Sequence, residues 1–130
     1  MKSETLSIYI DCDWREVYEA VSDLMNFPKW AKTFCRSIKK IDGSWYEMDT
    51  PQGSTKIRIA PRNEFGVVDH YLVSPKGEEV YVPMRVVPNG EGCELLFTLF
   101  QRPGMTDEMF TSDRALVLKD LATLKKVMEK

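Results

Sequence analysis

Turn-forming residues divide the middle of the chain into short segments. The turns are Asp42-Gly43, Pro51-Gln52-Gly53, Pro61-Arg62-Asn63, Ser74-Pro75-Lys76-Gly77 and Pro88-Asn89-Gly90. Between them lie runs near residues 35–41, 44–50, 54–60, 65–73, 79–87 and 93–101, and Pro103-Gly104 follows the last run. Short runs bounded by Gly, Pro, Asn and Asp are typical of antiparallel strands joined by tight turns. The pattern therefore predicts an antiparallel meander.

One more strand is predicted before the meander. Between residues 4 and 10, Leu6, Ile8 and Ile10 alternate with Thr5, Ser7 and Tyr9. This alternation has the period of a half-buried strand, because successive side chains point to opposite faces. With the six runs of the meander, the sequence predicts seven strands.

Three helices are predicted around these strands. Asp13, followed three residues later by Glu16, resembles a capping box and starts a helix of about ten residues. Pro28 suits the first turn of a second short helix that carries Trp30. Thr106 is a good N-cap, and no Gly or Pro follows it to residue 130, so a long final helix is expected.

Length, charge and cysteine usage restrict the class of protein. The 130 residues fit a single domain spanning 1–130, and interspersed charges with a net charge of -2 argue against a nucleic-acid partner. Residues 1–6 lack the apolar core of a signal peptide, and no apolar run is long enough to span a bilayer, so a soluble, cytoplasmic protein is expected. Cys12, Cys35 and Cys93 lack the spacing of a zinc site or disulfide framework and are expected to be free thiols.

The order of the elements resembles a known superfamily. Val17-Tyr18-Glu19-Ala20-Val21-Ser22-Asp23 and Phe27-Pro28-Lys29-Trp30 are similar to the aromatic, Val-Ser-Asp and Pro-x-Trp pattern of START-like (SRPBCC) proteins, in the polyketide cyclase/dehydrase-type group. Cys12-Asp13 stands where many members have proline. The resemblance implies an α+β helix-grip fold: a seven-stranded curved antiparallel sheet grips the last helix, and a cavity between them takes a hydrophobic or amphipathic molecule. It implies no catalytic residue, because the superfamily has no shared catalytic signature.

The final helix carries an apolar stripe that one charge interrupts. Its members are Phe110, Val117, Leu121, Leu124 and Met128. Arg114 falls inside the stripe and Asp113 near its edge. This position predicts that the N-terminal half of the helix borders a polar space, in which Arg114 would bind an oxygen-bearing end of the ligand. The alternative is that Arg114 extends along its own stem to the surface.

The only histidine of the chain is predicted to point into the cavity. A three-residue turn at Pro75-Lys76-Gly77 would pair Leu72 with Val80, His70 with Val82 and Val68 with Met84, all on one largely apolar face. Asp69 would then point the opposite way and form an exposed ion pair of little weight with Arg85. In apolar surroundings the pKa of His70 should be depressed. The alternative is a histidine that bonds only to backbone or water.

Three functions remain open from the sequence. The first is binding of a small lipid-like or aromatic molecule, with ligand-binding residues Trp30, Val68, His70, Met84, Phe97, Phe110 and Arg114. The second is a cyclase or dehydratase-type enzyme that uses His70 in the same cavity. The third is a protein-interaction module that uses Tyr71, Tyr81 and Arg85 on the convex sheet face. No cofactor, metal or membrane insertion is predicted, and the oligomeric state is left open.

Overall fold

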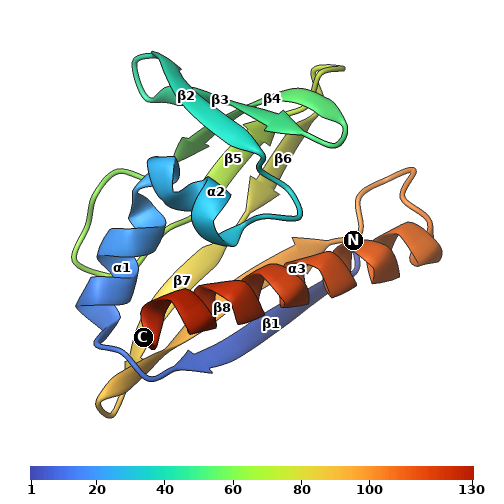
Figure 1. Cartoon of the computed structure of the whole chain (residues 1–130). Coiled ribbons are helices and arrows are strands. Elements are labelled where there is room, and N and C mark those ends of the chain that lie inside the picture. Colours follow the sequence, from blue (N-terminus) through green and yellow to red (C-terminus); the bar gives the residue numbers. More distant parts are fainter.

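The computed structural model describes residues 1–130 and shows an α+β fold (Figure 1). The strands are β1 (Ser3–Ile10), β2 (Ser37–Asp42), β3 (Trp45–Thr50), β4 (Gly53–Ile59), β5 (His70–Val73), β6 (Glu79–Val82), β7 (Met84–Asn89) and β8 (Gly92–Phe100). The helices are α1 (Trp14–Ser22), α2 (Phe27–Trp30) and α3 (Asp107–Met128), with the 3-10 turn η1 (Leu24–Asn26) before α2.

The strands form two antiparallel sheets, so the prediction of one seven-stranded sheet is wrong. One sheet has the order β2-β3-β4-β5-β6, and the other has the order β1-β8-β7. The run predicted at 79–87 is divided at Pro83 into β6 and β7. Proline has no N–H to donate to a ladder, which makes a run less able to continue as one strand. The carbonyl of Pro83 instead accepts a hydrogen bond from the Thr98 amide at 3.0 Å.

A short segment before β5 connects the two sheets. The Val68 amide donates to the Met84 carbonyl, and the Val86 amide donates to the Gly66 carbonyl, each at 2.9 Å. Gly66 has a φ of +72°, and a Cβ there would lie 2.0 Å from the Val86 oxygen. Only glycine allows the chain to approach β7 this closely. The segment 66–68 is therefore held against one sheet, while β5 continues into the other.

The register predicted for the hairpin is confirmed. His70 pairs with Val82 and Leu72 pairs with Val80 across β5 and β6. The isolated bridge between Val67 and Arg85 extends the same register past Pro83. The tight turn thus determines which residues share a face, even though the strand is interrupted.

The helix starts predicted from capping residues are also confirmed. The Asp13 side chain accepts from the Arg15 amide at the start of α1, and Pro28 lies in the first turn of α2. Thr106 Oγ1 accepts from the Met109 amide at the start of α3. These bonds satisfy amides that have no partner within a helix.

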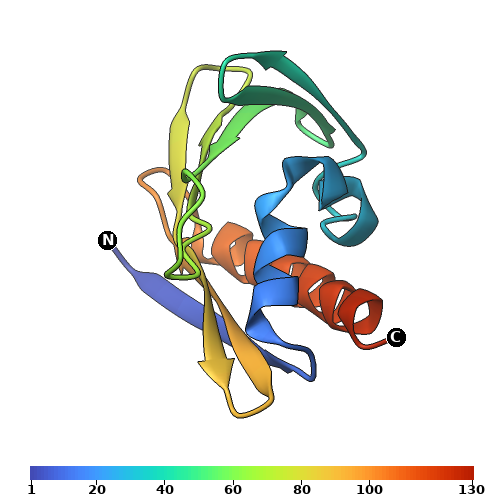
Figure 2. The ribbon, with the colours of Figure 1, turned by 90° about the vertical axis from the view of Figure 1, so that its left-hand side faces the viewer.

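All three helices lie on the same side of the two sheets. Figure 2 shows the sheets curving around α1, α2 and α3, with β2 and β3 extending over α2. The core between these layers contains fully buried apolar side chains from both sheets and from α1 and α3, including Ile10, Val17, Val21, Met48, Ile57, Met84, Leu95, Leu121 and Leu124. No helix is both long and apolar enough to cross a membrane.

Candidate functional site: a cavity between the sheets and the last helix

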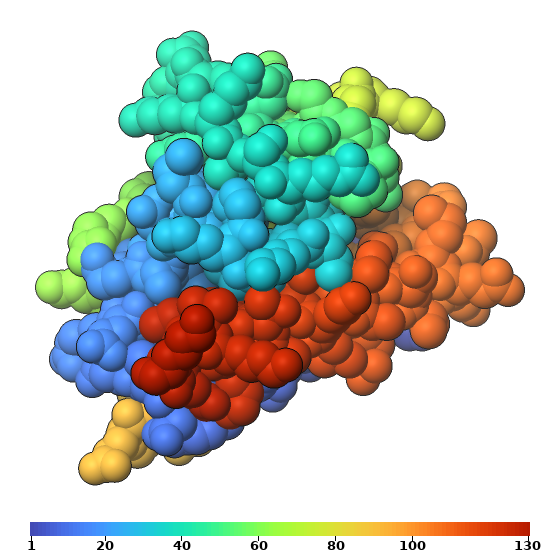
Figure 3. Space-filling view, viewed as in Figure 1, coloured from blue at the N-terminus to red at the C-terminus, as the bar shows by residue number.

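A cavity of about 590 Å³ lies where the two sheets meet the helices. Its walls come from α2 and the residues after it, from β5, β6 and β8, and from residues 113–120 of α3. The segment that follows α2 lies against the middle of α3 in the space-filling view (Figure 3). There, the Thr33 amide and hydroxyl donate to the two oxygens of Asp120 at 3.0 and 2.6 Å. These bonds connect α3 to the chain after α2 at one wall of the cavity.

One end of the cavity is aromatic. Phe27 meets Trp30 edge-on, with ring centroids 5.2 Å apart. The His70 ring is edge-on to both Phe27, at 5.8 Å, and Phe97, at 6.1 Å. Edge-to-face packing at these distances is favourable for aromatic rings. Trp30 Nε1 is buried and has no hydrogen-bond partner, so this wall contains two polar groups, the indole N–H and the His70 imidazole.

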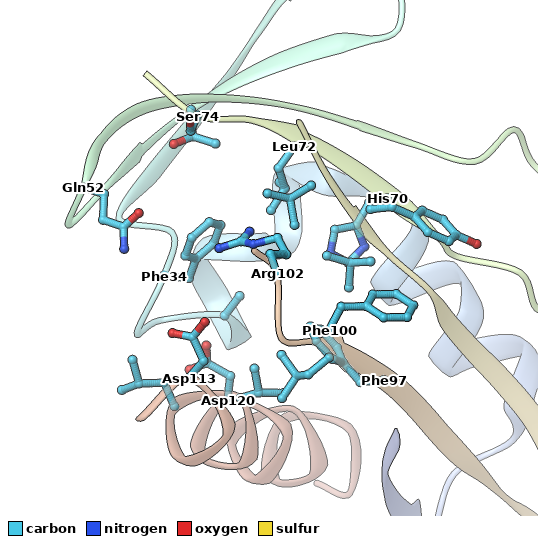
Figure 4. A pocket seen from close by; sticks show the side chains of 18 of the residues that line it. Phe34, Gln52, His70, Leu72, Ser74, Phe97, Phe100, Arg102, Asp113 and Asp120 are labelled. Carbon is cyan, nitrogen blue, oxygen red and sulfur yellow. The ribbon is translucent and has the colours of Figure 1, made fainter. Parts of the chain in front are cut away.

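His70 is neutral at physiological pH because of this environment. Burial of the ring lowers its pKa from 6.5 to about 4, although the Val68 carbonyl, 3.4 Å from Nδ1, favours the charged form slightly. Nε2 makes no hydrogen bond within the protein, and the residue lines the cavity (Figure 4). With the proton on Nδ1, Nε2 can accept a hydrogen bond from a molecule in the cavity.

Asp69 does not orient His70. Its oxygens accept from the Tyr81 hydroxyl at 2.8 Å, the Met84 amide at 2.8 Å and the Arg85 guanidinium at 2.9 and 3.0 Å. Burial would raise the pKa of Asp69, but these hydrogen bonds outweigh it and lower the pKa. The predicted pair with Arg85 is present, and its Arg85 side is exposed as predicted, but its Asp69 side is buried. Asp69 is only 7% exposed, and it also accepts a hydrogen bond from the Met84 amide next to Pro83.

The opposite end of the cavity is polar. Figure 4 shows Arg102, which follows β8, directed into the cavity near Phe34, with Asp113 and Asp120 on the facing side of α3. Burial raises the pKa of Asp113, and the positive charge of Arg102 partly opposes this. Burial likewise raises the pKa of Asp120, against the effect of the Thr33 hydrogen bonds. No group of three or more His, Cys, Asp or Glu side chains is arranged to hold a metal ion.

Three of the seven residues predicted from the sequence line the cavity: Trp30, His70 and Phe97. Val68 and Met84 do not line it, because they are fully buried in the core where segment 66–68 meets β7. Phe110 is buried at the start of α3, with the Lys2 ammonium 5.3 Å from its ring centroid.

Arg114 also lies outside the cavity lining, contrary to the prediction. Its Nε donates to Glu4 of β1 at 2.5 Å. The residues of α3 that line the cavity are Asp113, Leu116, Val117 and Asp120, which share one helical face. Arg114 is rotated from Asp113 by about 100°, toward β1. The predicted polar space is therefore present, but other side chains provide its charges.

Sequence reasoning missed Arg102 as a lining residue. It lies two residues beyond Phe100, the last residue of β8, so the alternation that places Phe97 and Leu99 on the inner face does not extend to it. Asp113 was placed only near the edge of the apolar stripe, although its spacing of four residues from Val117 puts it on the same face.

Comparison with solved structures identifies proteins of the same fold at low sequence identity. No family model and no curated protein matches the chain. A START superfamily protein from Mycobacterium smegmatis is similar in structure, with a TM-score of 0.74 and 14% identity over 98% of this chain and 97% of that chain. XoxI from Bacillus cereus has a TM-score of 0.79 and 15% identity, over 98% of this chain and 96% of that chain.

A third similar structure is that of Aha1 from Colwellia psychrerythraea, a dimer in solution. Its TM-score is 0.74 at 18% identity, over 99% of this chain and 97% of that chain. Likenesses at such low identity establish the fold alone. They confirm the resemblance to the START-like superfamily at that level, and the chain has a START-like fold.

Proposed function

We propose that the protein binds a small hydrophobic or amphipathic molecule in the cavity between the sheets and α3. The observation that carries the proposal is the cavity itself, about 590 Å³ in volume and walled mainly by aromatic and aliphatic side chains. Sites for small molecules in proteins are typically concave, largely apolar and equipped with a few polar groups. The START-like fold supports the proposal, because the resemblance of the sequence to START-like proteins implies a ligand cavity between sheet and last helix.

Trp30, His70 and Phe97 are the residues proposed to contact the apolar part of the ligand. Trp30 is only 4% exposed and fixed by Phe27, so it offers a rigid surface. His70 offers Nε2 as an acceptor and remains uncharged at neutral pH. Val68 and Met84 support this wall from the core behind it. The arrangement favours a carrier or sensor over the enzyme, because no carboxylate orients the imidazole.

A fluorescence titration with a matched pair of variants tests the proposal. N-phenyl-1-naphthylamine, an uncharged apolar fluorophore, should bind the wild-type protein saturably and gain intensity. Val117 lines the cavity, whereas its neighbour Leu118 is exposed and does not. Val117→Trp should fill the cavity and weaken binding at least about tenfold, which corresponds to the loss of about 1.4 kcal/mol. Leu118→Trp adds the same side chain outside the cavity and should leave binding unchanged.

The unfolding temperature of both variants should be measured first, so that the comparison is made between folded proteins. The absence of saturable binding to the wild-type protein would contradict the proposal. Equal binding by folded Val117→Trp would also contradict it, because the fluorophore would then occupy another site.

A further inference from the structure

Arg102 has unused hydrogen-bonding capacity at the polar end of the cavity. A guanidinium has five N–H donors. None of those of Arg102 donates a hydrogen bond in the protein, and Nε is buried without a partner. The only charged contact is with Glu78, where Nη1 and Oε1 are 3.7 Å apart, beyond normal hydrogen-bond distance. The Nη groups likewise donate no hydrogen bond, so an acceptor supplied from the cavity would gain charge-assisted hydrogen bonds here.

Asp113 is a hydrogen-bond acceptor without a donor in the protein. Its carboxyl group is half-buried on the face of α3 that lines the cavity, and no protein donor bonds to it. This distinguishes it from Asp120, two helical turns away, whose oxygens are both occupied by Thr33. Arg102 and Asp113 face the same space but form no ion pair with each other. One group is an unused donor, and the other is an unused acceptor.

The charges around this space disfavour a charged ligand head. The lining contains one arginine, Arg102, and four carboxyl groups, namely Glu78, Glu79, Asp113 and Asp120. An anionic head would bond to Arg102 but would lie among these carboxylates. A cationic head would bond to Asp113 but would leave the donors of Arg102 unpaired and be repelled by them. Only a group that both accepts and donates satisfies the two side chains together.

We infer that the polar head of the ligand is an uncharged donor–acceptor group, such as a primary amide or a hydroxyl, that bridges Arg102 and Asp113. Its oxygen accepts from the guanidinium, and its N–H or O–H donates to the carboxylate. The apolar part of the same molecule then extends toward the aromatic end at Trp30 and Phe97. This inference rests on the proposed function and specifies the chemical class of the ligand.

Competition between three matched compounds tests the inference. Octanamide, octanoate and octylammonium share a chain length and differ in the charge of the head at pH 7. Each would displace N-phenyl-1-naphthylamine from the wild-type protein. Octanamide should compete at concentrations about tenfold lower than either charged compound, because it keeps both hydrogen bonds to charged groups.

Substitution of either charged side chain should change the preference in a defined direction. Asp113→Asn leaves Arg102 without its opposing charge. The affinity for octanoate should therefore increase about tenfold relative to the affinity for octanamide. Arg102→Gln removes the repelling charge beside Asp113, so the affinity for octylammonium should increase by a similar factor relative to octanamide. Glu108→Gln and Arg114→Gln are matched controls on α3, outside the cavity lining, and should keep the wild-type preference.

The outcomes separate the inference from the proposed function. If the fluorophore does not bind the wild-type protein, the proposed function and the inference fail together. If it binds, but a charged octyl compound competes as well as octanamide, the inference alone is wrong. It is also wrong if Asp113→Asn and Arg102→Gln both retain the wild-type preference.

Discussion

His70 illustrates how burial determines the charge of a side chain. The sequence shows only an imidazole among apolar neighbours, with a carboxylate beside it. In the structure His70 is 4% exposed, and its neighbour Asp69 bonds instead to Arg85, Tyr81 and the Met84 amide. Burial therefore dominates, and the pKa of His70 falls to about 4. A neutral histidine in this position can donate or accept a hydrogen bond without placing a charge in an apolar wall.

The lowered pKa of His70 predicts a loss of stability at mildly acidic pH. The unfolded chain binds a proton below about pH 6.5, whereas the folded chain binds it only below about 4. The free energy of unfolding should therefore decrease as the pH falls through this window, by about 2 kcal/mol between pH 7.5 and 5. In His70→Gln this contribution should be absent. Urea denaturation of both proteins at the two pH values measures it.

Several carboxyl groups also have shifted pKa values in the folded protein, so the comparison with the variant is essential. The raised pKa values of Asp113 and Asp120 act in the opposite direction, because these carboxyl groups bind protons more readily in the folded state. The pKa of Asp69 is lowered, so its contribution is lost below the usual range of a carboxyl group, outside this window. An equal decrease in wild type and His70→Gln would show that His70 is not the cause.

At the scale of elements, local signals in the sequence predicted strand pairing and helix starts, but they did not predict where a strand is interrupted. The turn at Pro75-Lys76-Gly77 gave the pairing of His70 with Val82, and Asp13 and Thr106 gave the starts of two helices. The division of a strand at Pro83 could not be predicted, since proline also occurs within edge strands. The alternation of side chains that predicted the face of His70 continues through Asp69, although the chain passes there from one sheet to the other.

The link between the two sheets depends on Gly66. Gly66→Ala should lower the free energy of unfolding by more than about 3 kcal/mol, because its Cβ would overlap the Val86 carbonyl and its φ of +72° is unfavourable for alanine. Gly90→Ala is the matched control, since Gly90 has a φ of +60° with no atom near the added Cβ. Its cost should be only about 1 to 2 kcal/mol. Urea denaturation measures both, and equal losses would contradict the close approach.

At the scale of the whole molecule, the cavity results from two connections that are distant in sequence and one that is local. Segment 66–68 connects the two sheets, and Thr33 connects the chain after α2 to Asp120 of α3. The local connection is the end of β8, which places Arg102 two residues beyond Phe100. The presence of a cavity between sheet and helix could be anticipated from the order of the elements. Its polar residues could not, because they depend on the rotation of α3, which directs Asp113 inward and Arg114 toward Glu4.

The central claim is that this cavity binds a ligand next to His70, and an NMR titration of the imidazole tests it most directly. His70 is the only histidine, so its ring signals need no assignment among others. Addition of octanamide to the wild-type protein should shift these signals saturably, and the shift should be lost in Val117→Trp. Ring signals that stay unchanged while octanamide displaces the fluorophore would place the ligand elsewhere and contradict the claim.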